Sequence, residues 1–437
     1  MISALKRNAV VEGSEGEMEK DNHDKGAFYR RANILVVCQY YYPENFQITP
    51  ICEALATDGY KVTVLTGLPN YPAGIVPREY RHGHRKEYRN GVHIVRCYEF
   101  GRKKGPVCLA VNYASFAATA WKKAGELKED YDIVFCYQLS PIFMGLPARR
   151  YAQKHKVPFL LYCCDIWPES VKLYIRNERN VLFKATKVIS KIIYSFADRI
   201  VVQSTSFIDY LERTHNIDRE KIRYIPAFAE ETYVLTDFTP NDETTDFVFL
   251  GNLGIAQDLM SVIKAVKAIA YIPNFKVHFV GDGACLDEMK EYVKAAQLED
   301  IVFFYGRQPT EDMPKYYQLA DVCLVSLKAD NAIGLTLPTK LQGYMAAGKP
   351  VIAMIDGSAR DVIQESGCGI CVKPGDTEAL SHAMRDFIEH KEKYSDCGKK
   401  GRDYFKANFA KERCMRELEF VIDELLEARS EKDNVGI

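Results

Sequence analysis

Short apolar, β-branched runs alternate with longer helical patterns along most of the chain, and this alternation constrains the fold more than any other feature. A strand buried in a parallel sheet has such a continuous apolar run, and a helix normally separates it from the next strand. One series of runs begins at Asn33 and a second begins at Phe247. The pattern predicts an α/β protein with two Rossmann-like, doubly wound parallel-sheet domains that face each other across a cleft.

The predicted organisation has four parts. The first sheet should need six or seven strands, and the last 60 or so residues contain helical patterns without a further strand. The predicted parts are a disordered tail (residues 1–30), an N-terminal Rossmann-like domain (31–226), a C-terminal Rossmann-like domain (227–405) and a C-terminal helix that crosses back to the N-terminal domain (406–437).

Composition excludes several classes of protein. The chain has 58 Lys and Arg residues and 59 Asp and Glu residues. It therefore lacks the overall positive charge expected of a protein that binds nucleic acid. The 13 cysteines have no regular spacing and mostly lie in apolar runs, which is typical of a reducing compartment. No apolar segment is long enough for a membrane span or a signal peptide. We therefore expect a cytoplasmic protein.

The segment of residues 337–352 carries the strongest local signal, because a loop, a short helix and a buried strand follow one another there. Thr339 and Gln342 have the spacing of a capping box, which would leave other amides at the helix start directed at an anion. Lys340 would add a full positive charge, as a diphosphate leaving group requires. The alternative is an ordinary capped helix whose lysine points to water.

Several blocks of the second half resemble the nucleotide-binding half of GT-B glycosyltransferases of family four. They are residues 280–284, 304–307, 320–321, 345–351, 357–363 and 374–376. The first half resembles the family more loosely, through residues 40–44 and 58–59. Residues 165–170 and 251–257 are similar to a branch that adds amino sugars of the N-acetyl-L-fucosamine type to surface polysaccharides.

The resemblance implies a retaining hexosyl- or N-acetylhexosaminyl-type glycosyltransferase. The donor would be a nucleotide sugar, with UDP preferred, and the acceptor a saccharide or a polyprenyl-linked saccharide of surface polysaccharide synthesis. Residues 31–226 would bind the acceptor and residues 227–405 the donor. We expect no cofactor besides the donor substrate and no metal, since no Asp-x-Asp follows a predicted strand.

The predicted site divides between the two domains. The catalytic candidates are Asp165 and Glu169, which precede and open a helix start at the cleft, and Lys340. The donor-binding candidates are Gly251, Asn252, Gly254, Gln257, Gly281, Gly283, Gly306, Arg307, Leu337, Pro338, Thr339, Lys340 and Gln342. Glycines in these loops would let the backbone approach the diphosphate closely.

The chain also departs from the family pattern. Two glutamates usual in the family are replaced by Leu335 and Gly343, and a cleft histidine is absent. Gln342 is the substitute expected at the donor ribose, and Gln138 or Ser140 at the donor. These departures leave two rivals open: a catalytically silent GT-B partner subunit, and a nucleotide-sugar epimerase or hydrolase on the same scaffold.

A basic segment between the second and third predicted strands is a candidate for peripheral contact with the inner face of the plasma membrane. A solvated basic loop is the alternative interpretation. Its cationic and histidine residues are Arg78, Arg81, His82, His84, Arg85, Lys86 and Arg89.

Overall fold

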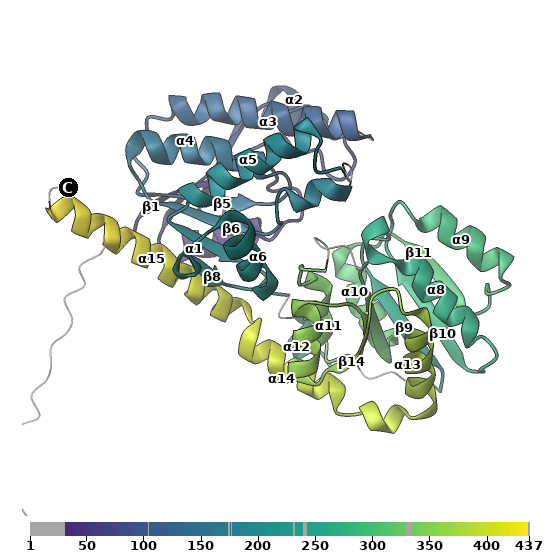
Figure 1. Ribbon diagram of the computed structural model, residues 1–437. Coiled ribbons are helices and arrows are strands. Elements are labelled where there is room, and N and C mark those ends of the chain that lie inside the picture. Colours follow the sequence, from purple (N-terminus) through teal and green to yellow (C-terminus); the bar gives the residue numbers. More distant parts are fainter. Residues whose placement is uncertain are drawn as a thin grey trace, which may run out of the picture.

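The computed structural model describes residues 31–103, 105–173, 175, 177–229, 232–238, 243–328 and 334–435. The tail predicted to be disordered, residues 1–30, lies outside the described residues. Figure 1 shows two α/β domains, with a long C-terminal helix that runs from the second domain back along the first.

The first sheet has the strand order β3-β4-β2-β1-β5-β6-β7-β8, and only β3 is antiparallel to its neighbour among the described strands. These strands are β1 (Asn33–Val37), β2 (Lys61–Thr66), β3 (Lys86–Arg89), β4 (Val92–Arg96), β5 (Ile133–Gln138), β6 (Phe159–Cys163), β7 (Arg199–Val202) and β8 (Ile222–Tyr224). Its order reverses at β1, which pairs with β2 on one side and β5 on the other. Such a reversal places a ligand crevice at the carboxyl ends of β1 and β5.

Helices cover both faces of the first sheet. One apolar core packs α3, α4, α5 and α6 on one face, and a second core packs α1 and α15 on the other. The helices are α1 (Ile48–Thr57), α2 (Arg78–His82), α3 (Pro106–Glu126), α4 (Gly145–His155), α5 (Val181–Phe196) and α6 (Thr205–His215). Short 3-10 turns are η1 (Ile142–Met144), η2 (Glu169–Leu173) and η3 (Arg219–Lys221).

The second sheet is parallel throughout its described pairs, with the order β11-β10-β9-β12-β13-β14. Its strands are β9 (Thr245–Leu250), β10 (Phe275–Val280), β11 (Val302–Gly306), β12 (Val322–Ser326), β13 (Val351–Met354) and β14 (Gly369–Val372). One face packs on α10, α11, α12 and α14, and the other on α8, α9 and α13.

The remaining helical elements belong to the second domain, except for the C-terminal helix that runs back along the first domain. They are α7 (Thr232–Leu235), α8 (Leu259–Ala268), α9 (Leu286–Ala295), α10 (Met313–Leu319), α11 (Thr339–Ala346), α12 (Ser358–Ser366), α13 (Thr377–Glu389), α14 (Cys397–Asn408) and α15 (Lys411–Val435), with turns η4 (Ile255–Gln257), η5 (Thr310–Asp312) and η6 (Lys391–Tyr394).

The first sheet has eight strands, so the prediction of six or seven was too low. The edge strand β3 forms a hairpin with β4 through Asn90 and Gly91, which both have positive φ. An Asn-Gly pair with this geometry makes the two-residue turn that suits a hairpin, and β3 itself is half exposed rather than apolar. Its polar sequence explains why the search for apolar runs missed it.

Helix α15 is part of the first domain's core although it follows the second domain in sequence. Leu418, Val421 and Ile422 are nearly fully buried in the core that also contains residues of β1 and α1. At the helix surface, Tyr60 donates a hydrogen bond to Asp423 at 2.9 Å. The chain therefore passes between the two domains twice. It enters the second domain after β8 and returns to the first domain through α15.

Candidate active site

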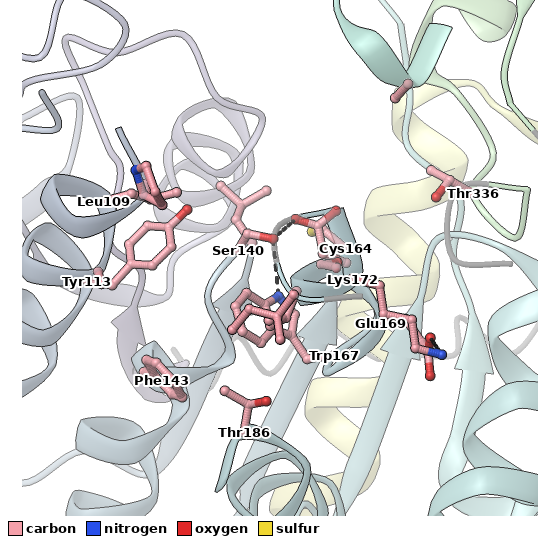
Figure 2. A pocket seen from close by; sticks show the side chains of 18 of the residues that line it. Leu109, Tyr113, Ser140, Phe143, Cys164, Trp167, Glu169, Lys172, Thr186 and Thr336 are labelled. Carbon is pink, nitrogen blue, oxygen red and sulfur yellow. Dashed lines mark hydrogen bonds and ion pairs between the residues drawn. The ribbon is translucent and has the colours of Figure 1, made fainter. Parts of the chain in front are cut away.

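A cavity of about 1150 Å³ lies between the loops of the two domains. The first domain contributes residues of α3, η1, the segment after β6 and α5, and the second contributes residues of η4, of α11 and of the loop before α11. Of the predicted site residues that the structure describes, Asp165, Glu169, Gln257, Leu337, Pro338, Thr339 and Lys340 line it. The structure thus brings both walls of the predicted site to one cavity, of which Figure 2 shows part of the lining.

Asp165 follows β6 and is held by a neighbouring loop. Its Oδ2 accepts a hydrogen bond of 2.8 Å from the hydroxyl of Ser140, and that hydroxyl accepts one of 3.1 Å from the Trp167 indole nitrogen. Figure 2 shows Trp167 below Ser140, joined to it by a dashed line. Burial raises the pKa of the Asp165 carboxyl above its usual value, while the bonds from Ser140 oppose that shift. A carboxylate so fixed can orient an acceptor hydroxyl.

Glu169 also lines the cavity, but its carboxylate already has two partners. Its Oε1 accepts a hydrogen bond from the Tyr210 hydroxyl at 2.8 Å, and Oε2 lies 2.5 Å from the Lys172 ammonium. Only 8% of Glu169 is exposed. These bonds hold the turn η2 against α6, and the catalytic role predicted for Glu169 stays a prediction.

For the sugar transfer that the family resemblance implies, we predict that Asp165→Asn lowers the rate by about a hundredfold, the loss expected when an acceptor hydroxyl is no longer held in place. The amide oxygen can still accept the Ser140 hydrogen bond, so the unfolding midpoint should change little. Radiolabelled donor in a single-turnover assay measures the rate. A wild-type rate in the variant would show that Asp165 serves only to hold Ser140 and Trp167.

Lys340 lies on the opposite wall, in the first turn of α11. Its Nζ is 3.6 Å from the centroid of the Phe249 ring and would be 3.3 Å from a Cβ built at Gly251. Within the described residues this nitrogen has almost no exposed surface and no hydrogen-bond acceptor. Burial lowers its pKa to about 7. An ammonium group without an acceptor, beside a glycine loop, is suited to an incoming anion.

The start of α11 differs from the predicted capping box. The helix begins at Thr339, its N-cap is Pro338, and no side chain caps it. Gln342 is fully buried, and its side-chain amide lies against the carbonyls of Pro338 and Thr339. The prediction that Gln342 replaces a ribose ligand is therefore wrong, since the amide is used inside the helix start. The uncapped amides retain the positive end of the helix dipole.

The glycine loops of the second domain pack backbone against backbone. A Cβ at Gly281 would lie 1.8 Å from the Gly251 carbonyl oxygen, and one at Gly283 would lie 2.4 Å from the Leu253 carbonyl group. A Cβ at Gly254 would meet the side chains of Asn252 and Gln257. These glycines therefore position the loop that carries Gly251 beside Lys340.

Two predicted donor residues lie one strand further away. The Gly306 carbonyl accepts a hydrogen bond of 2.9 Å from the Gly281 amide, and the adjacent Arg307 is exposed. They lie at the carboxyl end of β11, next to the glycine loops. This is the region where the family resemblance implies a nucleobase pocket.

Other predicted contacts fall inside the protein. Gln138 is fully buried and donates to the carbonyls of Leu139 and Asp165, so the prediction that it contacts the donor is wrong. Ser140, the alternative, lines the cavity. At Gly343 a Cβ would lie 2.8 Å from the Tyr317 hydroxyl, so this position has no room for the usual glutamate.

Sequence reasoning missed much of the cavity wall. Phe143 and the start of α3 provide apolar surface, including Val107 and Tyr113. A visible signal existed, because residues 106–121 contain no charged side chain although they form most of a surface helix.

The basic segment is divided between α2 and β3. His84 lies 3.0 Å from Glu87 and Arg89 lies 3.4 Å from Glu53, so part of its charge is paired. The described residues contain no group of three or more His, Cys, Asp or Glu side chains that could hold a metal ion. No described helix has the length and apolar character needed to cross a membrane.

Comparison with known proteins agrees with this geometry. Residues 46–227 match the model of the glycosyl transferase 4-like domain, and residues 236–404 match that of the glycosyl transferases group 1. The probable glycosyltransferase WbjE of Pseudomonas aeruginosa is 27% identical over 57% of this chain and 64% of its own length. Mannosylfructose-phosphate synthase of Agrobacterium fabrum is 24% identical over 59% of this chain and 61% of its own length. Both matches therefore span less than two thirds of the relative's length.

Solved structures share the fold. Sucrose-phosphate synthase from Thermosynechococcus elongatus superposes with a TM-score of 0.72 at 20% identity, over 91% of this chain and all of that one. HepE of Anabaena in complex with UDP gives 0.66 at 14% identity, over 90% and 100%. The chain therefore carries these two glycosyltransferase family domains one after the other, and it has the GT-B fold.

Proposed function

We propose that this protein transfers a sugar from a UDP-linked donor to a saccharide or polyprenyl-linked saccharide acceptor, with retention of anomeric configuration. The observation that carries the proposal is the buried Lys340 ammonium, which has no acceptor among the described residues and lies beside the Gly251 loop. Asp165 lines the same cavity from the facing domain. A diphosphate would bind the lysine, while the carboxylate would meet the acceptor hydroxyl.

The proposed reaction needs charge neutralisation and positioning more than covalent catalysis. The bond between the anomeric carbon and the donor diphosphate oxygen breaks, and the acceptor oxygen bonds to that carbon from the same face. The acceptor proton passes to the departing diphosphate oxygen. Lys340 and the amides at the start of α11 stabilise the negative charge that develops there, so we propose that no divalent metal is required.

The comparisons support the donor and the biological setting of this proposal. HepE has been solved with UDP and with UDP-glucose. The O-antigen chain mannosyltransferase C of Escherichia coli is 24% identical over 91% of this chain and all of its own length. We propose a role in surface polysaccharide synthesis, at the inner face of the membrane, and an N-acetylated amino sugar as the transferred group. The second part rests on the likeness of residues 165–170 and 251–257 to amino-sugar transferases.

A second candidate, a silent partner subunit, is favoured by one observation. The position of the family's second glutamate is Gly343, and the space above it is taken by Tyr317. A subunit of this kind would bind the donor but would not transfer its sugar to an acceptor. Turnover with a purified acceptor distinguishes it from the enzyme.

We predict that UDP raises the unfolding temperature more than GDP or ADP does, and that excess EDTA leaves the shift unchanged. Ligand at a hundred times its Kd stabilises the native state by about 2.7 kcal/mol. Differential scanning fluorimetry measures the shift, and UDP-sugars that exceed UDP identify the transferred group. Loss of the shift in EDTA would instead assign the diphosphate to a metal.

A further inference from the structure

Helix α3 has an unusual outer surface. Its first sixteen residues, 106–121, include no charged side chain. Val107 is 74% exposed and Val111 43%, and even Trp121 is 38% exposed. A helix on the surface of a soluble protein normally has charged or polar residues on its outer face. Exposed apolar side chains that cluster along one helix indicate an interaction surface.

Helix α5 packs on the same face of the first sheet as α3 and has a different pattern of exposed residues. Val181, Val188 and Ile192 are exposed, by 79%, 58% and 42%. The helix has no acidic residue, and its charged side chains are Lys184, Lys187 and Lys191, all exposed. The spacing of the lysines places them in one stripe next to the apolar stripe. Cations beside an exposed apolar stripe are typical of helices that lie in a membrane interface.

Both helices contribute side chains to the active-site cavity. Val107 and Val111 of α3 and Leu182 of α5 all line it, and the same three side chains are strongly exposed. The apolar surface therefore continues from the outside of the molecule into the cavity. Inside, the Phe143 and Trp167 rings extend it toward Ser140.

We propose that the exposed faces of α3 and α5, here called the α3–α5 face, bind an anionic phospholipid bilayer. The occupant follows from charge: three lysines without an acidic neighbour on α5 complement anionic headgroups, and the uncharged surface of α3 enters the interface. The cavity then opens at the bilayer, where a polyprenyl tail could enter while its headgroup reaches Asp165. This placement differs from the basic segment of α2 and β3, on which the sequence alone placed membrane contact.

Vesicle sedimentation tests the proposal with the full chain. Wild-type protein should sediment with vesicles of 30% phosphatidylglycerol in phosphatidylcholine and much less with phosphatidylcholine alone, and salt should weaken binding. Replacing all three α5 lysines (K184E/K187E/K191E) should lower the partition coefficient by about a hundredfold or more, because three cations that attract the anionic surface are lost. Serine at Val181, Val188 and Ile192 should lower it in both vesicle types.

A matched control replaces three exposed lysines of the second domain, K264E/K290E/K294E, and so changes the net charge by the same amount as the α5 variant. It should bind vesicles nearly as well as wild type. The UDP-induced rise in unfolding temperature should persist in every variant, which separates loss of membrane binding from loss of the donor site or of the fold. Equal losses in the α5 and control variants would overturn the proposal, as would loss only in R81E/K86E. Wild-type protein that ignores anionic vesicles would overturn it outright.

Discussion

Lys340→Ala is expected to reduce kcat/KM for sugar transfer by two to three orders of magnitude, about the effect of removing one group that stabilises transition-state charge. The reason is the site of its ammonium, buried beside Gly251 with no acceptor among the described residues. The UDP-induced rise in unfolding temperature should fall as well. Steady-state kinetics with the preferred donor, together with scanning fluorimetry, measures both effects.

The matched variant Lys340→Met keeps the length of the side chain without its charge. The Lys340 pKa is about 7 in the folded protein against the usual 10.5, so the unfolded chain binds the extra proton between these values. Wild-type stability should therefore rise with pH from about 7 toward 10.5, and Lys340→Met should lose this dependence and exceed wild type at pH 7. Urea unfolding at pH 7 and pH 9 measures it. A methionine variant that is inactive yet less stable would contradict the assignment of Lys340 as an unpaired charge.

Donor binding should be coupled to the same proton. A diphosphate favours the charged ammonium, so binding above pH 7 should take up protons and weaken as pH rises. Calorimetric titration of UDP in buffers of different ionisation enthalpy measures the uptake.

Gly281→Ala is expected to destabilise the second domain by about 3 to 5 kcal/mol and to abolish UDP binding. The added Cβ would lie 1.8 Å from the Gly251 carbonyl oxygen, and Gly281 has a φ of +149°. The two loops would separate, and Gly251 would leave its place beside Lys340. Urea unfolding and the UDP-induced thermal shift measure the two consequences.

Gly375→Ala is the control, since Gly375 has a φ of +77° but a Cβ there meets nothing within 4 Å. It should cost only the strain of a left-handed residue, about 1 to 2 kcal/mol. UDP binding should survive. Equal losses in both variants would mean that backbone strain, and not the contact between the loops, decides the outcome.

The sequence predicted the sheets well because most of their strands are buried on both faces. β1 and β5 are almost fully buried, and such strands have apolar runs that a reader of the sequence can find. Strands β3 and β8 are short and partly exposed, so they lack this signal. The Asn90-Gly91 pair was the remaining clue to β3.

The site was only partly predictable, for a physical reason. Asp165 and Lys340 follow local patterns at the ends of strands and the starts of helices, and both line the cavity. The roles of Gln342 and Gln138 depend on which buried carbonyl groups lie nearby, and only the packed fold fixes that. Their polar side chains satisfy the protein's own backbone, which local spacing does not reveal.

The position of α15 has a consequence for biosynthesis. The first domain buries Leu418, Val421 and Ile422, so its core stays incomplete until residues 411–435 have left the ribosome, after the whole second domain has been made. The N-terminal domain is thus discontinuous in sequence. The apolar surface of α1 and β1 stays exposed until α15 packs on it. Chaperone demand during translation should accordingly fall sharply only when α15 docks.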